Sequence, residues 1–267
     1  MRTSPTLLTL DRYFELLASE TEQLASALES ALEFDAMSAP VQACPEWTLA
    51  DLGYHVGDVT RFWTWVVSTG ATSTAGEPEF VRPSDAQLAD WVRVGVRELI
   101  ATLAPADPST PAYSWTPQQD VAFVQRRVPH EVAVHRWDAE HAARHATNVP
   151  PRPIAYDLAS DGVSEFFLLA SSWPVTWATS GAGAVRLLAT DTNTEWTAWV
   201  DDSVMRWSTE VSRVADDEIP EVVATLSGPA SDLLLTLWRR LGLDESAVRV
   251  DGDAAPARQF LALANLD

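Results

Sequence analysis

Apolar residues recur at spacings of three and four through the first part of the chain, the pattern of helices with one buried side. Four segments show it, at residues 10–33, 49–67, 84–103 and 117–147. Polar residues that commonly cap helices precede the last three segments, namely Thr48, Ser84 and Thr116. Since short connections favour antiparallel neighbours, the pattern predicts an up-down-up-down four-helix bundle.

The pattern changes beyond NVPPRP at 148–153, which is too rich in proline for a helix and is typical of a linker. The predicted elements that follow are a helix at 155–171, strands at 184–190, 195–201, 204–210 and 221–228, and helices at 229–242 and 256–266. The first three strands predict an antiparallel meander. We therefore expect an α+β protein, with a bundle domain at 1–150 and a small domain with an antiparallel sheet at 151–267.

The charge of the chain excludes several classes of partner. Asp and Glu number 38 against 18 basic residues, all of them Arg, and the net charge is −20. Such a surface repels phosphate backbones and anionic lipids, so we expect neither nucleic acid nor membrane as a partner. The chain has no long apolar run of the kind that predicts a leader or a membrane span. We therefore expect a cytoplasmic monomer or small homo-oligomer. The single cysteine, Cys44, excludes an intramolecular disulfide.

The segment VPHEVAVHRWD in the predicted fourth helix contains the strongest candidate for chemistry. Glu131 and His135 are four residues apart and share one helix face, where they can hold a divalent metal if another helix adds a ligand. His55, in the predicted second helix, is the best candidate for that ligand. Asp138 and Asp58 each follow a histidine by three residues and are placed to orient its imidazole. Spacing alone also fits a surface pair or a core hydrogen bond.

The remaining histidines fit a metal site less well. His130 and His135 are five apart, whereas the H-E-x-x-H motif of zinc proteases needs four, so His130 is expected on another face. His141 and His145 have helical spacing but lie far along the axis from Glu131, in a charged and alanine-rich stretch. We interpret both as solvated.

Two segments, CPEWTLADLGYHVGDVTRFW and RRVPHEVAVHRWDAEHA, resemble the mycothiol-dependent maleylpyruvate isomerase family, within the DinB-like bundle superfamily. LSGPASDLLLTLWRRL and VRVDGDAAPARQFLA resemble the C-terminal domain of that family, which is similar to sterol carrier proteins. The resemblance spans nearly the whole chain. It implies a divalent metal, usually zinc, held by His55, Glu131 and His135, and mycothiol as the thiol cosubstrate.

The resemblance therefore implies an enzyme in which a zinc-bound thiolate attacks a small electrophilic substrate. The reaction is either cis–trans isomerisation of a maleylpyruvate-like compound or transfer of mycothiol to another compound. A non-catalytic metal- or small-molecule-binding stress-response protein on the same fold stays open as the alternative.

Four residues are candidates to contact the thiol or the substrate. Trp47 precedes the helix of His55 and is placed to line a pocket there. Arg126, Arg239 and Arg240 are placed to bind a carboxylate. Arginines near a helix end also favour the helix dipole, so a purely structural role is open for Arg239 and Arg240.

Overall fold

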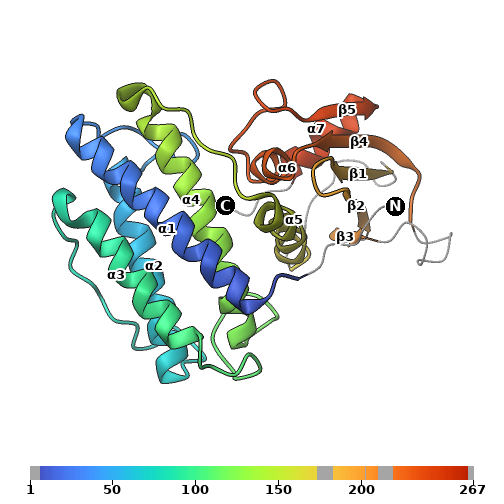
Figure 1. Cartoon of the computed structure of the whole chain (residues 1–267). Coiled ribbons are helices and arrows are strands. Elements are labelled where there is room, and N and C mark those ends of the chain that lie inside the picture. The colour runs from blue at the N-terminus through green and yellow to red at the C-terminus, as the bar shows by residue number, and fades with distance from the viewer. Residues whose placement is uncertain (1–6, 173–182, 202, 210–218, 264–267) are drawn as a thin grey trace. The chain divides into compact units, whose positions relative to one another are not determined.

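The computed structural model describes residues 7–172, 183–201, 203–209 and 219–263. The chain divides into two compact units, one over Thr9–Ile154 and the other from Ala155 on, together with the residues before Thr9 (Figure 1). The first is helical, and the second combines helices with a sheet. None of the helices within the described ranges is long and apolar enough to cross a membrane.

The first unit consists of four long helices, as predicted. They are α1 (Leu10–Glu33), α2 (Leu49–Thr69), α3 (Leu88–Leu103) and α4 (Val121–Thr147), with a 3-10 turn η1 (Asp85–Gln87) leading into α3. Both α1 and α2 pack against α3 and α4. The stripes of apolar residues meet in the middle, where fully buried side chains include Leu17, Leu24, Leu52, Val56, Leu99, Val128 and Val132. Burial of these stripes is the main driving force for the bundle.

The start of α2, the helix that carries His55, is fixed by the predicted capping box. Thr48 Oγ1 accepts a hydrogen bond from the Asp51 amide (3.2 Å), and Asp51 Oδ2 accepts one from the Thr48 amide (2.8 Å). The contacts from Thr48, with a further one from Arg82, lower the pKa of Asp51 to about 2. The first turn of α2 is thereby held in register with the loop before it.

The predicted start of α4 is wrong by four residues. Thr116 does not cap the helix, because its hydroxyl donates to the Gln118 carbonyl (3.1 Å) and keeps that segment in a loop. Asp120 is the cap instead, and its carboxylate accepts from the Phe123 amide (2.9 Å). From there α4 runs through Pro129 to Thr147.

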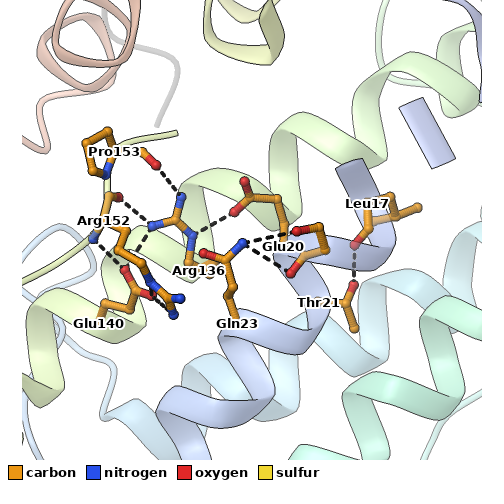
Figure 2. A network of polar contacts seen from close by, with 9 residues as sticks. Leu17, Glu20, Thr21, Gln23, Arg136, Glu140, Arg152 and Pro153 are labelled. Atoms are coloured by element: carbon orange, nitrogen blue, oxygen red, sulfur yellow. Dashed lines mark hydrogen bonds and ion pairs between the residues drawn. The ribbon is translucent and has the colours of Figure 1, made fainter. Parts of the chain in front are cut away.

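A buried arginine on α4 connects three parts of the first unit (Figure 2). The guanidinium of Arg136 is fully buried and donates to Glu20 of α1 (2.6 Å) and to Glu140 one turn along α4 (2.9 Å). It also donates to the backbone carbonyls of Arg152 (2.5 Å) and Pro153 (3.2 Å). Arg136 therefore holds the chain that leaves α4 against the bundle.

The second unit is an α+β fold, as predicted. Its elements are α5 (Tyr156–Ala170), β1 (Ala184–Ala189), β2 (Thr194–Asp201), β3 (Val204–Ser208), β4 (Val222–Gly228), α6 (Ala230–Leu237), β5 (Arg249–Gly252) and α7 (Ala254–Leu263). The strand order is β3-β2-β1-β4-β5, and the first three strands form the predicted antiparallel meander. The last residue of the third predicted strand, 210, and the last three of the final predicted helix, 264–266, lie outside the described residues.

The sheet differs from the prediction in two strands. β4 lies beside β1 and runs parallel to it, with Leu187 opposite Leu226, so the sheet is mixed. β5 was not predicted, because its four residues include Asp251 and Gly252 and lack the run of β-branched residues that marks a strand. In addition, α6 ends at Leu237, five residues earlier than predicted.

Candidate metal centre

The three proposed ligands, taken from two helices, converge in the structure. Glu131 Oε1 lies 3.4 Å from His55 Nε2 and 3.3 Å from His135 Nε2. The three donor atoms all lie within 4.8 Å of one another. α2 supplies His55, and α4 supplies the other two residues from successive turns. The packing of α2 against α4 therefore creates the cluster.

The two distances to Glu131 Oε1 fit a tetrahedral zinc site. Zinc bonds to nitrogen and oxygen of about 2.0–2.1 Å, arranged tetrahedrally, place neighbouring donor atoms roughly 3.3–3.4 Å apart. Both distances to Glu131 Oε1 match this separation. Two imidazoles and a carboxylate are ligands that zinc commonly uses, and three protein ligands leave a fourth position for a small molecule. The donor set therefore suits a catalytic zinc site.

Asp138 lies beside His135, the histidine that the sequence suggests it orients. Asp138 Oδ2 lies 3.1 Å from His135 Nδ1, and its side chain is almost fully buried. A proton on Nδ1 that is donated to this carboxylate leaves the Nε2 lone pair facing Glu131 and His55. The contact thus selects the ring tautomer that a metal requires.

The electrostatics of the cluster keep Glu131 ionised. Burial raises the pKa of Glu131, but the guanidinium of Arg127 and hydrogen bonds with both imidazoles outweigh it and hold that pKa well below its usual range. Burial lowers the pKa of His135, but its bonds to Asp138 and Glu131 outweigh this and raise it. A proton therefore competes with a metal for His135. Glu131 is already ionised at neutral pH and can bind a metal without first losing a proton.

Asp58 does not take the position around His55 that the spacing predicts. Its carboxylate instead accepts a hydrogen bond from Tyr54 Oη (3.3 Å). Tyr54 also donates to the carbonyl of Phe80 (3.0 Å), so this pair connects α2 to the loop before η1. Asp58 therefore helps to hold the loop before η1 against α2. It is not the partner of His55 that the sequence predicts.

Trp47 lies beside both histidines, as expected for a residue that lines the site. Its ring centroid is 4.6 Å from that of His55 and 6.2 Å from that of His135. The two imidazoles meet edge to face at 5.1 Å. The indole therefore shields part of the cluster from water, while the His55 side chain stays 30% exposed and leaves the cluster accessible.

Arg127 contacts the cluster, whereas the binding role expected of Arg126 stays a prediction. Arg127 is buried and its Nη2 pairs with Glu131 Oε2, four residues along the helix. The signal in the sequence was the four-residue spacing, which RR at 126–127 offers only in its second position. Arg239 and Arg240 belong to the second unit and lie beyond the end of α6, where their guanidinium groups donate to the carbonyls of Ala262 (2.5 Å) and Trp238 (2.8 Å).

The other histidines lie apart from the cluster, as predicted. His130 is buried and meets the ring of Tyr13 edge to face at 6.1 Å. His145 is exposed. His141 is half-buried and stacks on Trp137 at 4.7 Å, so it is less exposed to solvent than expected.

The Asp138 contact leads to a direct prediction. Asp138→Asn removes the carboxylate charge that orients His135, and we expect zinc affinity to fall about 10–100-fold. Chelator competition with the purified protein measures this change. Asp58→Asn is the matched control, since Asp58 stands at the same offset from a histidine but bonds to Tyr54. Equal losses in the two variants would contradict the assigned roles.

Comparisons with known proteins address the whole chain. The family model described as the mycothiol maleylpyruvate isomerase (MDMPI) N-terminal domain matches residues 17–140. The model described as the MDMPI C-terminal domain matches residues 157–259. The crystal structure of a mycothiol-dependent maleylpyruvate isomerase is similar, with a TM-score of 0.61 and 13% identity over 92% of this chain and 95% of that one. A histidine-to-alanine mutant of that isomerase gives a TM-score of 0.58 at the same identity and coverage. No curated protein matches.

Proposed function

Because the chain belongs to the mycothiol maleylpyruvate isomerase family, we propose that it is a metal-dependent enzyme that uses mycothiol to isomerise a small maleylpyruvate-like substrate. The observation that carries the proposal is the convergence of His55, Glu131 and His135, whose donor atoms all lie within 4.8 Å of one another. Those residues would hold a divalent ion, and zinc suits their chemistry.

A zinc ion with a bound thiol supplies a thiolate at neutral pH, which can add to a cis double bond, allow rotation about the resulting single bond and leave. Three residues of the chain would support this reaction. Asp138 holds the lone pair of His135 toward the ion. Glu131 supplies the one negative charge among the three ligands and so reduces the charge of the ion without cancelling it. Trp47 covers one side of the imidazoles and directs access to the other.

The test combines metal analysis with an assay of turnover. We expect one zinc ion for each purified chain, and cis-to-trans conversion of maleylpyruvate that requires mycothiol but does not consume it. Removal of the zinc with a chelator should abolish conversion, and adding zinc back should restore it. Cobalt(II), which favours the same ligands, is a second metal for this reconstitution.

The other outcomes separate the alternatives. Consumption of mycothiol with formation of a thioether product would assign the chain to S-transfer. Binding of zinc and mycothiol without any turnover would favour a binding protein. Failure of the freshly purified protein to contain zinc, and of the metal-free protein to take it up, would reject the metal centre.

A further inference from the structure

Arg127 lies against the oxygen of Glu131 that faces away from the histidines. The carboxylate divides its two oxygens, since Oε1 faces His55 and His135 whereas Oε2 pairs with Arg127 Nη2. The side chain of Arg127 is 9% exposed and that of Glu131 15% exposed. Charge-assisted bonds between groups so shielded from water are stronger than those between neutral partners. Arg127 therefore restrains one specific oxygen of a proposed ligand.

The restraint is needed because a glutamate side chain does not fix its own carboxylate plane. The terminal torsion of Glu is broad and close to two-fold, so rotation exchanges the oxygens at little cost. Near a metal, a free carboxylate can also bind through both oxygens. The position 127, four residues before Glu131 on the same helix, places the guanidinium where it prevents either change.

Binding through both oxygens would have a chemical cost. Three single-atom ligands leave one position of a tetrahedral zinc ion open, and a second oxygen from Glu131 would enter it or raise the coordination number to five. In either case the thiol would have to displace that oxygen. A ligand held to one oxygen therefore keeps the site ready for the thiol.

The geometry points to Arg127 as a positioning residue that holds Glu131 to single-oxygen ligation and so keeps the fourth metal position open for a thiol. This inference rests on the proposed metal centre. α4 then carries two of the three ligands and the orienting group of each on one stripe, with Arg127 holding Glu131 and Asp138 holding His135.

Cobalt(II) provides the test, because its visible spectrum distinguishes four- from five-coordination and its near-ultraviolet charge-transfer band reports a bound thiolate. The variants are Arg127→Met, which removes the charge and the donor, and Arg127→Lys, which keeps both. Arg144→Met is the matched control, since Arg144 is on the same helix but donates to the His141 carbonyl. Circular dichroism establishes that each variant is folded.

We expect all variants to bind one cobalt ion. The parent, Arg127→Lys and Arg144→Met should give four-coordinate spectra, whereas Arg127→Met should give a five-coordinate spectrum where water stays bound beside both oxygens and a four-coordinate one where the second oxygen replaces the water. Arg127→Met should also need at least about tenfold more mycothiol to develop the thiolate band, a change of roughly 1.4 kcal/mol or more in thiol binding.

A parent-like spectrum and thiol titration for Arg127→Met would overturn the inference and leave the metal centre standing. Lack of cobalt binding by the parent would overturn both, and so identifies a failure of the proposed function itself. If Arg127→Met does not fold, Arg127→Gln removes the charge with a smaller change in polarity and is judged by the same two criteria.

Discussion

Replacement of His135 by alanine should abolish zinc binding, whereas replacement of His141 should leave it within error of the parent. His135 supplies one of three donor atoms, and its loss leaves only Glu131 and His55 at the cluster. The effect should exceed the about 10–100-fold loss expected from altering its orienting carboxylate. Elemental analysis of protein after gel filtration gives the zinc content, and chelator competition gives the affinity.

His141→Ala is a stringent control for this prediction. His141 lies on the same helix, six residues on, and its ring stacks on Trp137 away from the cluster. Both variants remove an imidazole of the same size from α4, so a general loss of helix stability affects them alike. Parent-like zinc binding by both variants would show that the wrong histidines have been chosen.

Removal of Arg136 should cause the largest loss of stability. Arg136→Met leaves Glu20 buried without its cation and Glu140 with Arg152 alone, and it removes the donors for the carbonyls at 152 and 153. Burial already raises the pKa of Glu20, against the opposing charge of Arg136, so Glu20 would become still harder to ionise. Breaking a buried pair of this kind costs about 3–5 kcal/mol. Urea unfolding followed by circular dichroism measures the shift.

Arg93→Met is the control for Arg136. Arg93 also pairs with two glutamates of α1, at 3.0 Å to Glu22 and in a second bond to Glu29, but both of those carboxylates are mostly exposed. Exposed pairs contribute about 0–1 kcal/mol. A loss for Arg136→Met no greater than that for Arg93→Met would contradict the structural role of the network.

The sequence predicts the parts of the site that follow from helix geometry. Glu131, His135 and Asp138 obey the three- and four-residue rule, and the structure brings them together as spacing requires. The rule gives neighbours on one helix but says nothing about which of them finds a better partner elsewhere. Asp58 has the correct offset from His55 and bonds to Tyr54 instead, because Tyr54 is four residues away on its own helix.

In the fold, too, the sequence predicts features that depend on neighbouring residues and misses those that depend on distant segments. The four long helices and the meander follow from periodicity, which is a local property. The parallel pairing of β1 with β4 joins segments that are separated by two other strands, and no turn between them reveals it. The start of α4 was missed because Thr116 offers a cap signal, and only the competing bond to the Gln118 carbonyl cancels it.

The bond between Glu20 and Arg136 also bears on how the protein is made. The two residues are separated by 116 positions, and the carbonyls that complete the network come later still. At about 5–20 residues per second, a ribosome needs roughly 6–23 s to add the stretch between them. For that interval Glu20 and the side of α1 that packs against α4 lack their partners. α1 is therefore fully held in place only after α4 and the linker have been made, and this part of a newly made chain is exposed to chaperones and proteases until then.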